Sequence, residues 1–254
     1  QKAADPLRRM ALEHVTMHIP AGSFAALVGP SGGGKSTAGQ LLARFWDVES
    51  GSISIGGKDI RDYSTKALMN TVAFVFQDTY IFAESVYDNI AMHQNVTQEA
   101  VEYAAKAARC HDFIQALPES YHTKLGDGGH KLSGGEAQRI AIARAILKNT
   151  PIVVLDEAMA FTDAENELAL REGMAELLKG KTVLMIAHRL YSIQDADMIF
   201  VLENGRLKES GTHKDLLQKH GLYAHLWDIQ NETESWRMKG GAVYVSDNPA
   251  IHLP

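Results

Sequence analysis

FAALVGPSGGGKSTAGQLL, residues 24–42, is the stretch that decides the fold. AALVG (25–29) is a short apolar run ending in glycine and predicts a buried strand, while STAGQLLARFW (36–46) predicts a helix. Between them, GPSGGGKST (29–37) fits G-x-x-x-x-G-K-[ST], whose glycines let backbone N–H groups curl around phosphates. A flexible glycine-rich turn is the ordinary structural explanation, but the strand before it and the helix after it favour phosphate binding.

This loop supplies both backbone donors and charged or polar side chains for a nucleotide. Lys35 would place a positive charge beside the β- and γ-phosphates, and Ser36 would offer its hydroxyl to Mg²⁺. The residues assigned to phosphate binding are Gly29, Pro30, Ser31, Gly32, Gly33, Gly34, Lys35, Ser36 and Thr37.

Composition narrows the class of protein. The chain has 254 residues, of which 45% are hydrophobic and 22% charged, as in a globular protein with a sizeable core. Its net charge of −6 argues against a nucleic-acid partner, and the single Cys110 indicates a reducing, cytosolic setting. No apolar run approaches the roughly 18 residues of a membrane span, so the chain itself is expected to be soluble.

Apolar runs and helical stretches alternate along the chain. This order predicts an α/β architecture with a mostly parallel sheet, interrupted by a helical block. Further strands are expected at 52–60, 72–76, 151–156, 182–187 and 197–202, and helices at 97–117 and 165–178. Residues 231–254, with Gly240-Gly241 and two prolines, predict a poorly structured tail.

Two acids end the strand PIVVLDE (151–157), at the sheet edge where α/β proteins bind ligands. Asp156 would hold Mg²⁺ through water, and Glu157 would orient and activate an attacking water. Two acids after a strand are, taken alone, at least as often a cap for the next helix. The nearby phosphate loop favours the magnesium interpretation.

Two further polar residues follow predicted strands. Gln77 comes after VAFVF and could ligate Mg²⁺ and position water, although an isolated glutamine is more often a surface residue. His188 comes after TVLMIA and could hydrogen-bond a γ-phosphate or the attacking water, although a capping histidine is the ordinary explanation.

HKLSGGEAQRIAIARA (130–145) predicts a helix that begins with residues poor at forming helices. Ser133 and Glu136 have the spacing of a capping box, which leaves Gly134 and Gly135 unexplained. Without side chains, these glycines leave the N–H groups of the first turn open, and a helix N-terminus favours anions. The stretch therefore predicts a phosphate site presented on a surface.

Together these residues resemble the nucleotide-binding domain of ABC transporters over about 11–228. In that resemblance the motifs are Walker A at 29–37, the Q-loop at Gln77, the signature at 132–136, Walker B at 152–156 with Glu157 following, the D-loop ending at Asp163, and the switch histidine His188. The resemblance implies a P-loop NTPase core (1–76 and 149–230), an inserted helical subdomain (77–148), a partial antiparallel β-subdomain and a C-terminal tail (231–254).

The resemblance also implies ATP and Mg²⁺ as cofactors and a head-to-tail dimer with an identical or different ATPase domain. Ser133, Gly134 and Gly135 would then bind the γ-phosphate of the partner's ATP. Residues 77–90 and 124–135 resemble exporter-type proteins, in which Tyr80–Tyr87 and Asp127 would face the coupling helices of a transmembrane domain. The chain would thus act at the cytoplasmic face of a membrane, energising transport.

The sequence departs from the family pattern at several positions. No aromatic residue precedes Phe24, so the usual strand with its adenine-stacking side chain is missing. Glu136 stands where glutamine is common and is expected to fold back onto Ser133. DEAMAFTD (156–163) differs from the usual D-loop, and AFTDAENE is similar to exporter-fold siderophore importers.

Two other functions fit parts of the sequence. A soluble ABC protein acting on ribosomes or DNA would usually carry two ATPase domains, long coiled coils or basic patches, none of which is evident here. A module that clamps ATP without hydrolysis would fit the missing adenine stack, but Glu157, His188 and the intact signature favour hydrolysis.

Overall fold

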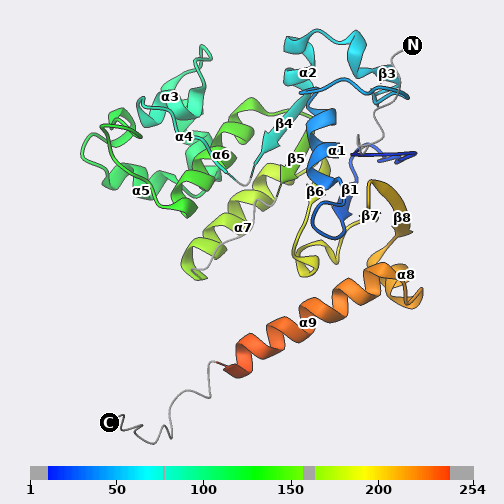
Figure 1. Ribbon diagram of the computed structural model, residues 1–254. Helices are drawn as coiled ribbons and strands as arrows, with labels where there is room; N and C mark the ends of the chain where they lie inside the picture. Colours follow the sequence, from blue (N-terminus) through cyan, green and yellow to red (C-terminus); the bar gives the residue numbers. More distant parts are fainter. Residues whose placement is uncertain (1–10, 77, 157–163, 241–254) are drawn as a thin grey trace, which may run out of the picture.

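The structure is a computed structural model that describes residues 11–76, 78–156 and 164–240 (Figure 1). A six-stranded sheet has the strand order β4-β5-β6-β1-β7-β8. All neighbours are parallel except β7 and β8, which pair antiparallel. This confirms the predicted α/β architecture with a mostly parallel sheet.

The strands predicted at 25–29, 72–76, 151–156, 182–187 and 197–202 form with small shifts at their ends, whereas 52–60 forms two short strands joined by a turn. The strands are β1 (Phe24–Val28), β2 (Ser54–Ile55), β3 (Lys58–Asp59), β4 (Val72–Val75), β5 (Ile152–Asp156), β6 (Thr182–Ile186), β7 (Met198–Glu203) and β8 (Arg206–Gly211). The α-helices are α1 (Lys35–Leu42), α2 (Thr65–Thr71), α3 (Val86–Ala91), α4 (Gln98–Ala107), α5 (His111–Ala116), α6 (Gly134–Lys148), α7 (Ala164–Leu178), α8 (His213–Gln218) and α9 (Leu222–Gly240).

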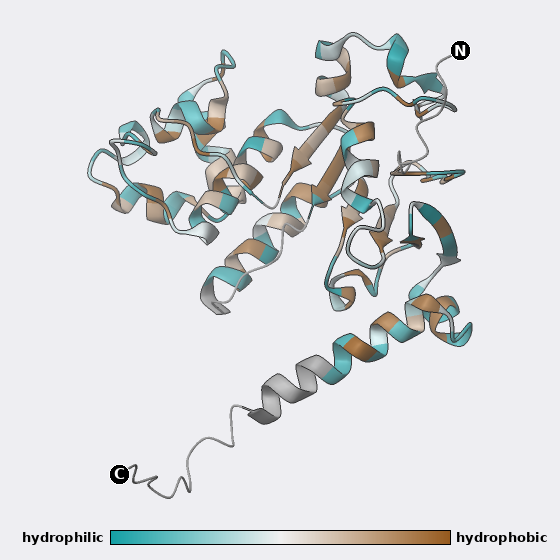
Figure 2. Cartoon of the chain, viewed as in Figure 1, coloured by the Kyte–Doolittle hydropathy of each residue, from teal (hydrophilic) through white to brown (hydrophobic). Residues whose placement is uncertain are grey.

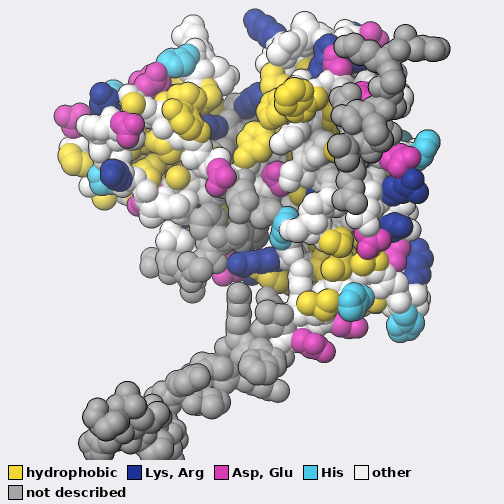
Figure 3. Space-filling model, in the orientation of Figure 1, with side chains coloured by type: hydrophobic (Ala, Val, Ile, Leu, Met, Phe, Trp, Pro, Cys, Tyr) yellow, Lys and Arg dark blue, Asp and Glu magenta, His cyan; other side chains and the backbone are white. Residues whose placement is uncertain are grey.

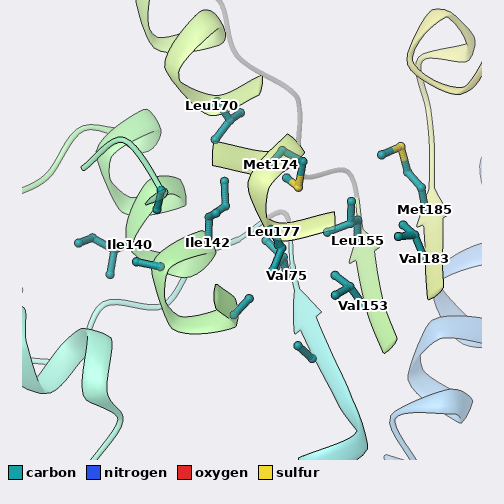
Figure 4. Packing of buried hydrophobic residues seen from close by; sticks show 14 of the residues in the cluster. Val75, Ile140, Ile142, Val153, Leu155, Leu170, Met174, Leu177, Val183 and Met185 are labelled. Atoms are coloured by element: carbon teal, nitrogen blue, oxygen red, sulfur yellow. The ribbon is translucent and has the colours of Figure 1, made fainter. Parts of the chain in front are cut away.

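Alternate residues of each central strand face opposite sides of the sheet, and each side has its own core. On one side, Leu27 and Ile186 pack with Ala38 of α1 and Leu68 of α2. On the other side, residues of the strands pack against the helices α3, α4, α5, α6 and α7. Figure 4 shows Met174 and Leu177 of α7 between β5 and α6. Because both faces are covered, the central strands are apolar along their length (Figure 2).

Helices α3 to α6 gather beside the end of the sheet that carries β4 (Figure 1). The single helix expected over 97–117 is wrong, because α4 ends at Ala107 and α5 begins at His111. Arg109 takes a left-handed φ of 56°, which a continuing helix does not allow. The break lets Ala108 lie against Gly173 of α7, where a Cβ would come within 3.0 Å of the Ala108 carbonyl oxygen.

Antiparallel structure is sparse at the N-terminal side of the molecule. β2 and β3 form a separate two-stranded hairpin, and residues 11–23 contain no strand. β8 is an edge strand that the sequence interpretation missed. Its signal was the dipeptide Asn204-Gly205, whose φ angles of 51° and 74° suit the tight turn between β7 and β8.

The C-terminal helix is longer than expected. α9 runs to Gly240, so residues 231–240 are helical and the expectation of a tail beginning at 231 is wrong for them. Residues 241–254 lie outside the described part of the chain. In the described ranges, no helix combines the length and apolar character that a membrane crossing requires.

Candidate functional site

The predicted phosphate-binding loop, called the P-loop below, joins β1 to α1 and packs tightly on the backbone of Leu202. Gly29 has a φ of 141°, and a Cβ there would stand 1.9 Å from the Leu202 carbonyl oxygen. Gly34, the residue before α1, has a φ of 100° and no side chain with which to cap the helix. The loop therefore requires glycine at these positions, and it leaves the first N–H groups of α1 without a side-chain cap.

Lys35 is held inside this loop. Its side chain is 4% exposed, and Nζ donates to the carbonyl oxygens of Gly29 at 2.8 Å and Pro30 at 2.9 Å. The positive charge thus sits within the turn formed by the glycines. This cation and the uncapped N-terminus of α1 together make the loop attractive to an anion.

The other predicted site residues on the core lie at the same edge of the sheet. Asp156 ends β5, and His188 lies two residues after β6. Because β5, β6 and β1 are parallel neighbours, their carboxyl ends meet beside the P-loop. Ser36 and Asp156 line one small pocket, together with Gln40 and Phe76.

Three predicted residues have no described geometry. Gln77, Glu157 and Asp163 lie outside the residues that the structure describes, as does the departure at Met159–Thr162. Phe76 and Asp156, which precede Gln77 and Glu157, both line the pocket that contains Ser36.

The donors at this pocket suit a hard divalent cation. A serine hydroxyl and a single carboxylate are the oxygen ligands from which Mg²⁺ sites on nucleotides are built, with phosphates and water completing the shell. Ser36 and Asp156 are therefore the described residues that could hold Mg²⁺.

The turn at the start of α6 confirms the predicted capping box. The Ser133 N–H donates to Glu136 Oε2 at 2.8 Å, and the Glu136 N–H donates to Ser133 Oγ at 3.3 Å. The Ser133 hydroxyl also donates to the same carboxylate oxygen at 2.9 Å. Glu136 thus folds back onto the cap, as expected.

The two glycines after Ser133 differ in their surroundings. Gly135 is buried, and a Cβ there would lie 3.1 Å from the side chain of Asn166 on α7. Packing between α6 and α7 therefore explains Gly135 without any ligand. Gly134 and Ser133 are exposed, so the surface open to an anion consists of these two residues.

The structure offers no replacement for the missing adenine-stacking residue among the aromatic side chains of β1. Phe24 begins β1, whereas the P-loop follows its other end. A strand rises about 3.3 Å per residue, so Phe24 lies on the order of 15 Å from the loop. Residues 11 and 12 instead cover the P-loop, with Leu12 Cδ2 close to Gly34.

Sequence interpretation missed two polar side chains that link α6 to neighbouring loops. Gln138 is 1% exposed, accepts from Thr79 Oγ1 at 2.7 Å and donates to the Phe76 carbonyl at 3.4 Å. It thus contacts residues on both sides of Gln77. The available signal was a glutamine on the apolar face of a predicted helix.

The second is Arg144, which holds the segment after Gln77. Its guanidinium donates to the Asn89 carbonyl at 2.6 Å, to Asn89 Oδ1 at 2.7 Å and to the Tyr80 carbonyl at 2.8 Å. Burial lowers the pKa of Arg144 to about 10, which leaves it charged at neutral pH. Tyr80 itself is exposed, whereas the Tyr87 hydroxyl donates to the Val96 carbonyl within the helical part.

Exposed aromatic residues also occur where α1 and β4 end. Phe45 and Trp46, just after α1, are 55% and 68% exposed, and the Phe45 ring stacks 6.2 Å from that of Phe76. Figure 3 shows hydrophobic side chains gathered near β4, at the top of the sheet-bearing part. An exposed aromatic cluster of this kind is typical of a surface that contacts a partner.

Comparisons with known proteins agree with these features. Residues 12–160 match the family described as "ABC transporter". The chain is 48% identical over 221 residues to the "Putative multidrug export ATP-binding/permease protein YgaD" of Bacillus subtilis, covering 87% of this chain and 38% of that protein. A relative of the same description in Staphylococcus aureus is 47% identical over the same length.

A solved structure gives the same result for the fold. "Structure of a bacterial Atm1-family ABC exporter with ATP bound" superposes with a TM-score of 0.81 at 41% identity, covering 93% of this chain and 40% of that chain. This chain therefore spans less than half the length of the proteins that it matches. With its P-loop, capped signature turn and strand order in place, the chain belongs to the ABC transporter family, and it carries that family's ATP-binding, ATP-hydrolysing domain.

Proposed function

We propose that this chain hydrolyses Mg·ATP within a head-to-tail dimer and so drives transport through membrane-spanning domains. The observation that carries the proposal is the meeting of the P-loop, Asp156 and His188 at the carboxyl ends of β1, β5 and β6. A phosphate loop, a metal-binding carboxylate and a histidine at one sheet edge are the parts that phosphoryl transfer to water requires.

Each residue has a role in this proposal. Lys35 exchanges its bonds to the loop carbonyls for the β- and γ-phosphates, and Ser36 with Asp156 holds Mg²⁺, which neutralises phosphate charge. Gln77 ligates the metal and positions water. Glu157 takes a proton from the attacking water, and His188 hydrogen-bonds the γ-phosphate.

The signature turn acts on the partner's nucleotide. Ser133 and Gly134 are exposed at the N-terminus of α6, and the capping box holds them in one conformation. In a head-to-tail dimer they contact the γ-phosphate of the ATP bound to the other P-loop, and we assign Asp163, which is outside the described residues, to the same nucleotide-binding function. The partner is a second ATPase domain, identical or related.

The surface that passes changes at the nucleotide to the transport domains comprises the segment Tyr80–Tyr87 and Asp127, together with the exposed aromatic residues Phe45, Trp46 and Phe76. Arg144 fixes that segment to α6, the helix that begins at the signature turn. A change at the nucleotide can therefore reach this surface through one rigid element. We place the surface against the coupling helices of the transport domains, at the cytoplasmic face of the membrane.

The relatives support export as the direction of transport in this proposal. Their printed names describe multidrug export and combine an ATP-binding part with a permease part in one protein. These names favour an exporter role over the siderophore uptake suggested by AFTDAENE at 160–167.

The first test is the molar mass in solution of the Glu157→Gln variant, with and without ATP and magnesium. We expect an ATP-dependent shift from monomer to dimer, because removing the general base traps the nucleotide between the two domains. The matched control adds Lys35→Ala, which removes the phosphate contact and abolishes the shift. A monomer at saturating ATP contradicts dimerisation through Ser133 and Gly134.

The rate of ATP hydrolysis distinguishes an ATPase from a module that binds ATP without hydrolysing it. The unmodified chain should turn ATP over, and Glu157→Gln should slow turnover by about 10²- to 10⁴-fold, the usual contribution of a general base. A chain that dimerises with ATP but shows the same turnover with and without Glu157 would be an ATP-binding clamp.

A further inference from the structure

The loop that carries His188 is held by a side chain from the far end of the sequence. Gln230 of α9 donates from Nε2 to the His188 carbonyl at 2.5 Å and accepts from the Leu190 N–H at 2.8 Å. One primary amide thus bonds both the carbonyl before and the N–H after Arg189. The side-chain amide of Gln230 thus makes the same pair of hydrogen bonds, one donated and one accepted, that the backbone of a neighbouring strand makes in a sheet.

These bonds satisfy backbone groups that the loop leaves open. Leu190 begins the short 3₁₀ helix Leu190–Ile193, and Arg189, in the N-cap position, makes no side-chain hydrogen bond to cap it. The first N–H groups of a helix need such partners. Gln230 therefore acts as the cap of this helix, supplied from another element.

The His188 backbone is fixed from two sides. Ala187 donates its N–H to the Leu27 carbonyl in β1, the strand that leads into the P-loop. The His188 carbonyl oxygen accepts a hydrogen bond from Gln230 Nε2. The position of the histidine relative to the P-loop thus depends on β1 on one side and α9 on the other.

α9 is itself anchored well enough to serve this purpose. Glu209 of β8 accepts from the N–H groups of Leu222 at 2.6 Å and Tyr223 at 3.1 Å. Tyr223 is fully buried, and Trp227, one turn further on, stacks edge-on against His213 at 4.6 Å. Gln230 continues the same helix face, since positions three and four apart lie side by side.

We propose that Gln230 is a positioning residue for hydrolysis, which holds the backbone of residues 188–190 and so sets where the His188 side chain meets the nucleotide. This inference rests on the role of His188 given under Proposed function. It makes α9 part of the hydrolytic machinery rather than only an anchored C-terminal helix.

The test compares Gln230→Glu with the matched control Gln218→Glu. The first replaces the donor to the His188 carbonyl with a second acceptor, while keeping the length of the side chain. The second makes the same charge change at an exposed position at the end of α8. We expect Gln230→Glu to lower kcat for ATP by about tenfold, the effect of losing a hydrogen bond or two. KM for ATP should change by less than about twofold, and Gln218→Glu should match the unmodified chain.

A double-variant cycle with His188→Ala shows whether the effect passes through the histidine. In single-turnover measurements, Gln230→Glu should lower the rate in the normal background and have no further effect in the His188→Ala background. An equal loss in both backgrounds, or a kcat within about twofold of the unmodified chain, overturns the proposal. If His188→Ala alone hydrolyses ATP at the normal rate, the role of His188 under Proposed function fails instead.

Hydrogen exchange of the peptide covering residues 188–193 tests the contact without nucleotide. Gln230→Leu, which removes both the donor and the acceptor of the amide, should raise exchange at the Leu190 N–H by about fivefold or more, because that N–H loses its acceptor. Unchanged exchange would mean that Gln230 does not hold this loop, and would overturn the proposal even if kcat falls.

Discussion

Two α-helices of the molecule, α1 and α6, begin at glycine-rich turns, and the first N–H groups of each need hydrogen-bond partners. The two turns differ in whether a side chain provides such a partner. At α1 the N-cap is Gly34, which offers no side-chain cap, and a buried lysine lies within the preceding loop. At α6 the N-cap is Ser133, whose N–H and hydroxyl are both bonded to Glu136. The first turn has no side-chain cap, whereas the second carries a complete capping box within the chain itself.

This difference suits the two functions proposed for these turns, which are nucleotide binding within one chain at the P-loop and contact with a partner domain at the signature turn. The P-loop packs against the backbone of Leu202 in β7 of the same chain, so it tolerates no side chain at Gly29. The signature turn has to persist on an exposed surface until a partner arrives, and a self-satisfied cap keeps it in one conformation. Substitutions at the two turns should therefore differ in size and in which measurement they affect.

The largest effect is expected at Gly29. Gly29→Ala would bring a Cβ to 1.9 Å from the Leu202 carbonyl oxygen and require a φ of 141°. We expect a loss of about 3 kcal/mol or more in the free energy of unfolding, together with loss of ATP binding. Urea unfolding measures the first and nucleotide titration the second.

Gly32→Ala is the matched control within the same loop. Gly32 also has a positive φ, of 75°, but no atom lies within 4 Å of the added Cβ. It should cost about 1–2 kcal/mol, the ordinary price of a left-handed alanine. Equal costs for the two substitutions would contradict the tight packing of the loop on Leu202.

Lys35→Ala should give the next largest effect, and it should fall on binding. The lysine makes charge-assisted contacts with the loop carbonyls now and with phosphates in the complex. Losing them should weaken ATP affinity by about 100-fold, because hydrogen bonds to charged groups contribute about 1.5–3 kcal/mol each. Lys66→Ala, at an exposed position on α2, should leave affinity unchanged in the same titration. A loss of less than about threefold would mean that Lys35 does not reach the phosphates.

Local patterns were enough to predict the parallel strands, the strand-loop-helix order around the P-loop and the capping box, whereas the edge strand β8 was missed. Each predicted feature is encoded within a few neighbouring residues, such as the spacing of Ser133 and Glu136. The break between α4 and α5 escaped this approach, because the alanine-rich run suits a helix and only packing of Ala108 on Gly173 explains the interruption. Gln230 and Gln138 escaped it as well, because their partners lie 40 and 59 residues away in sequence.

Ser133→Ala should have a smaller effect, divided between stability and association. Removing the N-cap side chain should cost about 1 kcal/mol in the free energy of unfolding. ATP-dependent association of the Glu157→Gln chain should also weaken by about tenfold, because a phosphate contact is lost. Ser64→Ala removes the N-cap serine of α2 and should cost the same stability without any change in association. Equal association for the two variants would exclude Ser133 from the interface.

The smallest effect is expected at Glu136, where the two roles of the signature turn compete. The Glu136 carboxylate completes the cap and also accepts a hydrogen bond from the Ser133 hydroxyl, with 2.9 Å between Oγ and Oε2. It would also lie close to an incoming phosphate. Glutamine can still accept the Ser133 N–H, and it removes the repulsion between two anions. Glu136→Gln should therefore strengthen ATP-dependent association of the Glu157→Gln chain by about two- to fivefold, since solvent and salt screen most of the charge. Sedimentation at increasing ATP measures the change, and added salt should shrink it. Weaker association would mean that the charge of Glu136 stabilises the docking conformation more than it repels phosphate, and the turn would then depend on its cap more strongly than on its open N–H groups.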